Sequence, residues 1–518
     1  MEDVCDPEGT TFSWVKTHPC FTQATAPNFS GILHITGKPG CGKSVLAKYI
    51  YTQLESTSSL RSDHPKPTIL FFAFNDRIEG RRTAENMLGA SILQLLDRSS
   101  IPWSMYENFV QWEEAGQSDD RTTRQWSLRE LLSTFKVFLT SDVLSAQGNG
   151  VICIIDGLDE CVGGADRKKL LDAFRHIIAH SQTMFQSVKF IITCRSYAEI
   201  EFTSLDPILL DLNAEDAVDK DISLYTIYRV DELIRQRPAF ASFRSQITSK
   251  LLQRADKMYL LIKLLLSTMH QMSLSSPHAI TKMLEALPTT LVELYNGIWE
   301  KIGHSERDQA KILLAWLTCL FRPLSLEELA IATAYFDFNQ EITSGDKAAD
   351  YSLYSDQFDR EKEILKYKPH GFRDDLHILF GPLVVIKDLS PNRHLRSDNT
   401  ALVQFCHLSV KDWVLQRQDL FNVGQAHFQL AFTCARYQDL TVAGDPDTYS
   451  IRTGDSAVTI WNQEMRTYGA FNSYAREYWQ GHRCAAEKLR PGAYEELRLR
   501  RQGERPYNRD VYGKPKDL

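Results

Sequence analysis

Residues 31–44 read GILHITGKPGCGKS, and this stretch decides the fold. Its first six residues form an apolar run that is typical of a buried strand. A complete G-x-x-x-x-G-K-[ST] loop follows from Gly37 to Ser44, and apolar residues at helical spacing come directly after it. Strand, glycine-rich loop and helix in this order predict a parallel α/β sheet that carries a phosphate-binding loop (P-loop) at its carboxyl edge.

The residue types of the loop indicate what it binds. Gly37, Gly40 and Gly42 let the backbone turn so that successive N–H groups converge on phosphate oxygens, and the next helix adds the positive end of its dipole. Lys43 supplies a charge to the β- and γ-phosphates, and the Ser44 hydroxyl is a ligand for Mg²⁺. The loop predicts ATP or ADP with Mg²⁺; ATP is favoured over GTP because no N-K-x-D-type guanine-reading motif occurs.

Further strand-like runs alternate with amphipathic helices up to about residue 213. The runs after the first one are TILFFAF (68–74), VICIID (151–156), KFIIT (189–193) and PILLDL (207–212). One helix between them is signalled by a capping box, Ser127 and Glu130, with Trp126 and Leu131 placed as a hydrophobic staple. Alternation of this kind predicts a P-loop NTPase fold, with a parallel sheet covered by helices on both faces.

A second group of candidate residues follows the run VICIID. Asp156 ends that strand, where a carboxylate can hold Mg²⁺ through a water molecule. Asp159 and Glu160 follow in the sequence DGLDE, and either of them can polarise the attacking water. Arg195 ends the next strand, KFIITCR, which we expect beside the Asp156 strand, so that its guanidinium can sense a γ-phosphate.

Two more features of this region have open interpretations. The pair Arg81-Arg82 opens the second helix and either faces phosphate or is a solvated helix start. Cys41 lies inside the P-loop, at a position that tolerates many residue types, and no base partner for it is evident in the sequence.

From about residue 216 the strand signals stop and helices dominate, one of them starting clearly at Ser276-Pro277. A capping box at Ser325 and Glu328 then introduces helices that are followed by two strand-like runs, the order of a winged helix. The expected organisation is a lead-in (1–27), a P-loop nucleotide-binding domain (28–215), a helical domain (216–303), a winged-helix-like domain (304–423), a helical segment (424–485) and a basic, loose tail (486–518).

Composition limits the class of protein. The chain has 518 residues, which is enough for three or four domains of about 150 residues each. Its 59 Lys and Arg stand against 66 Asp and Glu, and a net charge of −7 disfavours bulk nucleic-acid binding. No signal peptide and no run long enough to span a membrane is present, and the ten cysteines show no metal-ligand spacing. We expect a cytoplasmic protein with reduced thiols.

These residues together resemble the NACHT-domain proteins of the STAND type, which are signal-transduction ATPases abundant in filamentous fungi. The resemblance begins with GKPGCGKS, DGLDE and TCRSY and continues in order through LEALPTTLVELYNGIW to FCHLSVKDWV. It covers about residues 10–485. It implies a switch that is closed with ADP, opens and self-associates with ATP, and is reset by slow hydrolysis.

The resemblance also implies roles for single residues. Gly42, Lys43 and Ser44 match the phosphate and magnesium contacts of the family, Asp156 its second acidic motif and Arg195 its sensor. Pro288 matches the proline that packs near the adenine, and His407 the winged-helix histidine that reaches the ADP β-phosphate. Ser196 departs from the family by replacing a proline, whereas Tyr197 agrees with its variants.

The chain also departs from the family in what flanks the match. Family members usually carry an N-terminal effector and a C-terminal repeat sensor, and neither is evident here. An unknown protein partner that supplies these parts, or a reduced paralogue acting in trans, is the resulting expectation. The alternative to a hydrolysing switch is an interaction module that binds nucleotide without turnover. A DNA-binding regulator is disfavoured by the negative charge.

Overall fold

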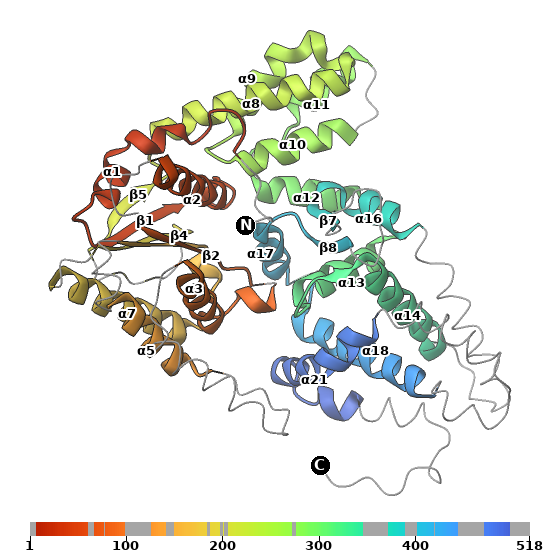
Figure 1. Cartoon of the computed structure of the whole chain (residues 1–518). Coiled ribbons are helices and arrows are strands. Elements are labelled where there is room, and N and C mark those ends of the chain that lie inside the picture. Colours follow the sequence, from red (N-terminus) through yellow and green to blue (C-terminus); the bar gives the residue numbers. More distant parts are fainter. Residues whose placement is uncertain are drawn as a thin grey trace, which may run out of the picture. The chain divides into compact units, whose positions relative to one another are not determined.

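The computed structural model describes most of the chain. The described residues are 7–60, 67–76, 78–98, 126–140, 150–183, 187–196, 200, 202, 206–271, 276–344, 371–388, 401–418, 420–443 and 471–497. They form two compact units, Met1–Thr290 and Leu291–Leu518 (Figure 1). Within the described parts, no helix combines the length and apolar character needed to cross a membrane.

A five-stranded parallel sheet forms the core of the first unit. Its strands are β1 (Gly31–Gly37), β2 (Thr68–Ala73), β3 (Val151–Asp156), β4 (Val188–Arg195) and β5 (Ile208–Asp211). The order is β2-β3-β4-β1-β5, so β4 lies between the strand that leads to the P-loop and the strand that ends at Asp156. All five predicted strands are present, and the predicted neighbourhood of β3 and β4 is confirmed.

Helices cover both faces of the sheet (Figure 1). α2 (Lys43–Leu60) and α1 (Pro19–Thr25) lie on one face, whereas α3 (Ala84–Arg98), α5 (Leu128–Leu139) and α7 (Gly164–Thr183) lie on the other. Alternate residues of β2, β3 and β4 pack against α3, α5 and α7. The residues between them along each strand point to the opposite face of the sheet. Burial on both faces explains why the strands read as continuous apolar runs. The structure therefore has the predicted α/β P-loop fold.

The capping box predicted for α5 is present. Ser127 Oγ accepts a hydrogen bond from the Glu130 N–H at 3.3 Å, and the Glu130 carboxylate accepts one from the Ser127 N–H at 2.9 Å. Leu131 is buried in the core and Trp126 packs against the same cluster. The two reciprocal bonds satisfy backbone donors that the first helical turn leaves open.

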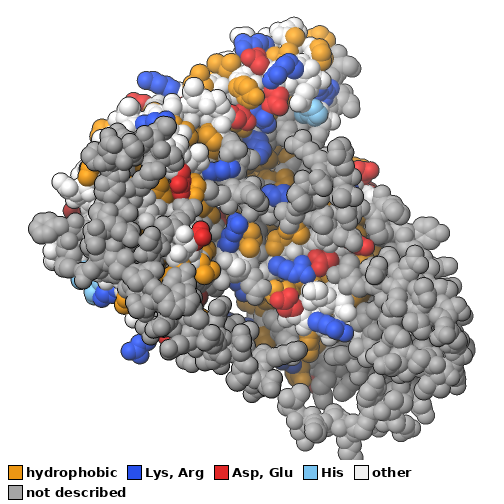
Figure 2. All heavy atoms as spheres, viewed as in Figure 1, with side chains coloured by type: hydrophobic (Ala, Val, Ile, Leu, Met, Phe, Trp, Pro, Cys, Tyr) orange, Lys and Arg blue, Asp and Glu red, His pale blue; other side chains and the backbone are white. Residues whose placement is uncertain are grey.

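The rest of the first unit is helical. It contains α8 (Asp216–Gln236), α9 (Arg244–Arg254), α10 (Tyr259–Gln271) and α11 (Pro277–Glu285). α11 starts as predicted, with the Ser276 hydroxyl accepting from the Ala279 N–H at 3.2 Å. Apolar and charged side chains are mixed on the surface of this part (Figure 2). The next helix, α12 (Leu291–Lys301), belongs to the second unit, whereas the sequence placed it with this helical segment.

The second unit contains a small antiparallel sheet of order β6-β8-β7. β6 (Leu324–Ser325) lies between α13 (Arg307–Cys319) and α14 (Leu326–Ser344). β7 (Val384–Asp388) follows α16 (Phe372–Phe380), and β8 (Ala401–Phe405) leads into α17 (Leu408–Gln416). Helices followed by an antiparallel strand pair were predicted for this segment, and the Ser325–Glu328 capping box is formed. Its assignment as a winged helix stays a prediction.

The last described elements are two helices that pack together. They are α18 (Val423–Ala443) and α21 (Asn472–Leu489). The prediction of a loose tail from residue 486 is wrong for residues 486–497. Ala486, Ala493 and Leu497 are buried in one cluster with Phe428 and Phe432 of α18. The sequence analysis did not predict a helix here, because these three buried residues alone give too weak a periodic apolar pattern. Residues 498–518 lie outside the described part.

Candidate nucleotide site

The P-loop connects β1 to α2 and has the backbone geometry that its glycines permit. Gly40 and Gly42 have φ values of +77° and +94°, where a side chain is strained. There is also no room for one, since a Cβ at Gly40 would lie 2.6 Å from Leu260 Cβ and one at Gly42 would lie 2.8 Å from Phe12 Cζ. Both glycines are therefore required by conformation and by packing.

Lys43 begins α2, and its side chain turns back to the backbone of the loop. Its Nζ donates hydrogen bonds to the carbonyl oxygens of Gly37 at 2.7 Å and Lys38 at 2.9 Å. The ammonium thus lies among the loop's own backbone groups, where the sequence analysis expects the phosphates. Cys41 is buried beneath the loop, and burial raises the pKa of its thiol, so the residue lacks the thiolate character of a nucleophile.

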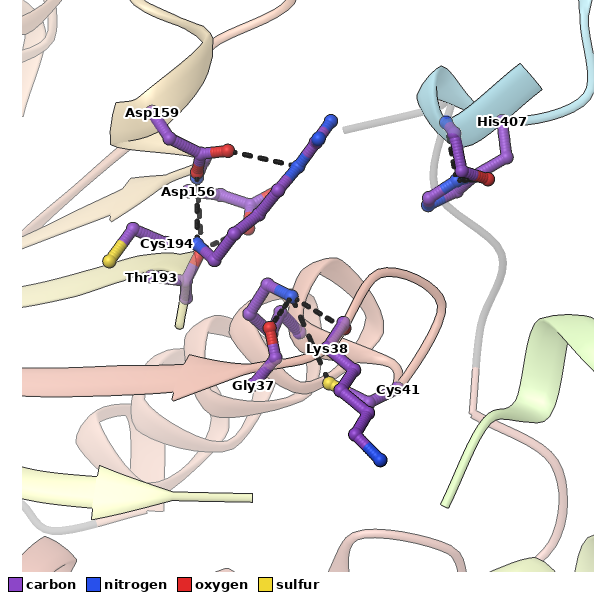
Figure 3. Close-up of polar contacts among 12 residues, drawn as sticks. Gly37, Lys38, Cys41, Asp156, Asp159, Thr193, Cys194 and His407 are labelled. Carbon is purple, nitrogen blue, oxygen red and sulfur yellow. Dashed lines mark hydrogen bonds and ion pairs between the residues drawn. The ribbon is translucent and has the colours of Figure 1, made fainter. Parts of the chain in front are cut away.

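Asp156 is the buried acid of the site. It ends β3, is only 4% exposed, and its Oδ1 accepts a hydrogen bond of 2.6 Å from the Thr193 hydroxyl of β4 (Figure 3). The Ser44 hydroxyl lies near enough to this carboxylate to favour its charged form. Burial raises the pKa of Asp156, while the hydroxyls of Thr193 and Ser44 and the charge of Lys43 lower it in part. The structure brings Ser44 and Asp156 together, as the prediction of a shared magnesium site requires.

Asp159 and Arg195 form an ion pair at the same edge of the sheet. Asp159 Oδ2 lies 3.1 Å from Arg195 Nε, and its Oδ1 accepts from the Arg195 backbone N–H at 3.3 Å (Figure 3). Both side chains are nearly buried, 12% and 11% exposed. Glu160 shares a single-turn 3-10 helix, Leu158–Glu160, with Asp159. Asp159 is thus engaged with the arginine, and the role of either acid in water activation stays a prediction.

The segment before β1 packs on the P-loop, which the sequence gave no reason to expect. Phe12, with φ of 65°, is buried beside Gly42, and its ring centroid lies 5.5 Å from that of Tyr259. The carboxylate of Asp221, on α8, accepts from the Phe12 N–H at 2.5 Å and from the Trp14 indole at 2.9 Å. One buried acid thereby fixes the amino-terminal segment against the loop.

The turn that leads into α10 also contacts the P-loop. The Leu260 N–H donates to the Gly40 carbonyl at 3.2 Å, and Lys38 Nζ lies 2.8 Å from a carboxylate oxygen of Asp256. Asp256 and Lys257 both have positive φ values, 41° and 60°. Non-glycine residues with this conformation are uncommon and mark a turn held by its surroundings.

The remaining predicted residues have these positions. Pro288 lies half-buried in the connection between α11 and α12. His407 belongs to the second unit and caps α17, its Nδ1 accepting from the Ser409 N–H at 3.1 Å. Arg81 ends a 3-10 turn, Glu79–Arg81, before α3, and Tyr197 lies outside the described residues. Contact of these residues with a nucleotide stays a prediction.

The donor set fits the predicted ligands. The Ser44 hydroxyl and the neighbouring Asp156 carboxylate are oxygen ligands of the kind that Mg²⁺ prefers. A P-loop that turns through two positive-φ glycines into a helix start, with a lysine ammonium within the loop, is suited to a polyphosphate.

Comparison with known proteins agrees with this site. The family model described as nephrocystin 3, N-terminal, matches residues 10–195. The match runs from the amino-terminal segment through the P-loop and Asp156 to Arg195, and it is less than half of the chain. No curated protein matches the chain.

Several solved structures are similar over longer stretches at low identity. One is a STAND protein with a tetratricopeptide repeat sensor from Pyrococcus horikoshii, 13% identical over 92% of this chain and 54% of that one, with a TM-score of 0.35. The chain thus spans about half the length of that protein. Cdc6p from Pyrobaculum aerophilum is 12% identical (81% of this chain, 97% of that one, TM-score 0.31). The ORC2 protein of Aeropyrum pernix in its ADP form is also 12% identical (80% and 96%, TM-score 0.29).

Proposed function

We propose that the chain binds ATP or ADP with Mg²⁺ at the P-loop and acts as a STAND-type molecular switch. The observation that carries the proposal is the cluster at the carboxyl edge of the sheet, where Lys43, Ser44 and Asp156 meet beneath the loop. The match to the nephrocystin 3 N-terminal model over the same residues supports it, as does the resemblance of the sequence to NACHT proteins.

In this proposal each residue has one task. The loop N–H groups and the Lys43 ammonium hold the phosphates, and Ser44 and Asp156 hold the magnesium ion. When bound, Mg²⁺ neutralises charge on the β- and γ-phosphates. Arg195 faces the γ-phosphate, and Asp159 holds Arg195 in place through its Nε and backbone N–H. Glu160, the other acid of the DGLDE sequence, has the task of polarising the attacking water.

The switch itself follows from the resemblance to the NACHT family. In that family's manner, the ADP-bound chain is closed, the ATP-bound chain self-associates, and slow hydrolysis resets it. Pro288 packs near the adenine and His407 donates to the ADP β-phosphate. A separate protein partner would supply the effector and sensor parts.

Native mass spectrometry of the purified protein tests nucleotide binding and assembly together. We expect the mass of ADP or ATP on the wild-type monomer, and larger assemblies when a slowly hydrolysed ATP analogue and Mg²⁺ are added. Lys43→Ala should purify without nucleotide, because each lost charge-assisted hydrogen bond to phosphate costs about 1.5–3 kcal/mol. A mutant that retains nucleotide as well as the wild type would remove the P-loop from the site.

A module that binds nucleotide without hydrolysis is the second candidate. The ion pair between Asp159 and Arg195 favours it, because two of the three groups that the sequence analysis assigned to catalysis neutralise each other there. Turnover separates the candidates: phosphate release that exceeds the Lys43→Ala background supports the switch, whereas retained ATP without phosphate release supports the module.

A further inference from the structure

Thr193 has contacts that neither the sequence nor the comparisons assign to any task. It lies on β4, opposite Ile35 of the P-loop strand β1 and next to Ile192, which pairs with Ile155 of β3. The side chain is completely buried. Thr193 therefore lies at the carboxyl edge of the sheet, between the strand that carries the P-loop and the strand that carries Asp156.

Both hydrogen-bonding functions of the Thr193 hydroxyl are used. It donates to Asp156 Oδ1 at 2.6 Å and accepts from the Gly157 N–H at 2.9 Å. Thr226, a buried threonine of α8, satisfies its hydroxyl with the nearby carbonyl of Ile222 at 2.7 Å. Thr193 instead bridges a carboxylate and the backbone of the turn that follows it, across 37 residues of sequence.

From this bridge we infer that Thr193 is a positioning residue for the magnesium ion, acting through Asp156. The inference rests on the proposed function. A hydroxyl that donates to one carboxylate oxygen fixes the rotation of the carboxylate, and this rotation decides how its oxygens can face a divalent cation. The same hydroxyl holds the Gly157 N–H and so fixes the start of the turn that carries Asp159 and Glu160.

The role differs from simple core packing in what it predicts. A threonine that only fills space can be replaced by valine, which has the same shape, at the cost of general stability alone. Substitution of a positioning residue instead weakens metal binding. Loss of a hydrogen-bond partner of a metal ligand typically lowers metal affinity about 10- to 100-fold. The two readings therefore separate in the dependence of nucleotide binding on Mg²⁺.

The experiment measures binding of a fluorescent ADP as a function of free Mg²⁺, and binding in EDTA. For Thr193→Val we expect the Mg²⁺ concentration of half-maximal effect to rise about 10- to 100-fold, while affinity in EDTA stays near that of the wild type. Thr193→Ser keeps the hydroxyl and should stay within about threefold of the wild type, since its donor and acceptor are unchanged. Thr226→Val is the matched control for loss of a buried hydroxyl, and it should leave the Mg²⁺ dependence unchanged.

Each other outcome has a distinct meaning. An unchanged Mg²⁺ dependence in Thr193→Val, or an equal shift in Thr193→Ser or Thr226→Val, overturns the role of Thr193. Wild-type protein that binds no nucleotide overturns the proposed function itself. Thermal unfolding in EDTA verifies that each variant is folded. If the valine variant does not fold, Thr193→Cys replaces it, because a thiol is a weaker donor and should give a smaller shift in the same direction.

Discussion

Asp159 and Glu160 are adjacent acids, and the contacts of Asp159 bear on which of them activates water. Both carboxylate oxygens of Asp159 contact Arg195, one at the side-chain Nε and one at the backbone N–H. A carboxylate that contacts an arginine through both oxygens has to release it before it can approach a water molecule. Asp159 is therefore the weaker candidate for the group that activates water, and we propose Glu160 for that role.

Substitution of the two acids tests this division. Glu160→Gln should keep nucleotide affinity and lower the rate of ATP hydrolysis by 10²- to 10⁴-fold, on the order of what a general base contributes. Asp159→Asn should weaken the hold on Arg195, and we expect a loss of affinity for ATP that exceeds the loss for ADP, because only ATP carries the γ-phosphate. Single-turnover hydrolysis and equilibrium binding of both nucleotides give the comparison. Equal rates for Glu160→Gln and wild type would transfer the base role to another group.

The residues that the sequence analysis identified are those whose role follows from local order along the chain. Lys43, Asp156 and Arg195 each end or follow a predicted strand, and the structure brings them to one edge as parallel strands require. Thr193 and Asp221 act through contacts with residues 37 and 209 positions away. No local pattern marks such partners, because a buried Thr in a strand or a buried Asp on a helix looks like any other until the fold is known.

At the scale of elements, the amino-terminal segment depends on a single helix residue. Asp221 is 5% exposed and accepts hydrogen bonds from both Phe12 and Trp14, and burial raises its pKa. Without this acceptor the buried Phe12 N–H and the half-buried Trp14 indole N–H lose their partner, and an unsatisfied buried donor costs about 1–3 kcal/mol.

Asp221→Ala should therefore release residues 7–17 from the P-loop. We expect limited proteolysis to cut this segment well before it cuts the wild type, and the melting temperature to fall. Asp221→Asn keeps an acceptor oxygen and is the control, with cleavage close to that of the wild type. Identical cleavage of Asp221→Ala and wild type would show that the hydrophobic contact of Phe12 with Tyr259 is sufficient to hold the segment.

Helices α18 and α21 are joined by two facing histidines, His482, which is buried, and His427, which is half-buried. His427 Nδ1 lies 2.8 Å from His482 Nδ1, and His482 Nε2 lies 2.7 Å from the Tyr474 hydroxyl. Burial lowers the pKa of His427 to about 4 and that of His482 well below its ordinary value of 6.5. The hydrogen bond between the two Nδ1 atoms already contains one proton, and a second proton at the same place would be repelled by it.

This pair should make the stability of the second unit depend on pH. Between pH 6.5 and about 4 the histidines are protonated in the unfolded chain but stay neutral in the folded one. The free energy of unfolding therefore falls as the pH falls through this range. Thermal unfolding followed from pH 7.5 to 5 measures the slope. His427→Gln removes one titrating ring and should flatten it, whereas His278→Gln, at an exposed position of α11, should leave it unchanged. An unaltered slope in His427→Gln would contradict the role of the pair.

Regular elements were predicted to within a few residues where a periodic apolar pattern coincided with a cap or a turn. The strands of the large sheet and the helix starts at Ser127, Ser276 and Ser325 are examples. The continuation of packed structure to Leu497 was missed because burial there comes from contact with Phe428 and Phe432, far back in the sequence.

For the whole molecule, His407 tests whether nucleotide controls assembly. Its Nδ1 accepts a backbone hydrogen bond, which places the proton of the neutral ring on Nε2, the atom that could donate to a phosphate. His407→Ala removes this donor and the helix cap together, whereas His407→Ser keeps an oxygen that can cap α17.

Both variants should release fluorescent ADP about 10- to 100-fold faster than the wild type in stopped-flow experiments, the effect of one charge-assisted contact. Both should also enlarge the assembled fraction in mass photometry. Only the alanine variant should lose stability, by about 1 kcal/mol for the missing cap. Wild-type release rates in His407→Ser would mean that the histidine is only a cap.

During synthesis β1, the strand before the P-loop, leaves the ribosome before β4 and β5, the two strands with which it pairs. In the finished sheet Leu33 pairs with Ile191 on one side and Ile208 on the other, whereas β2 and β3 pair with each other earlier in the chain. Until β4 has left the ribosome, β1 is an unpaired strand in which six of seven residues are destined for burial. Exposed edges of this kind aggregate. We therefore expect nascent chains that end before Val188 to be retained by chaperones, and chains that include β5 to escape them.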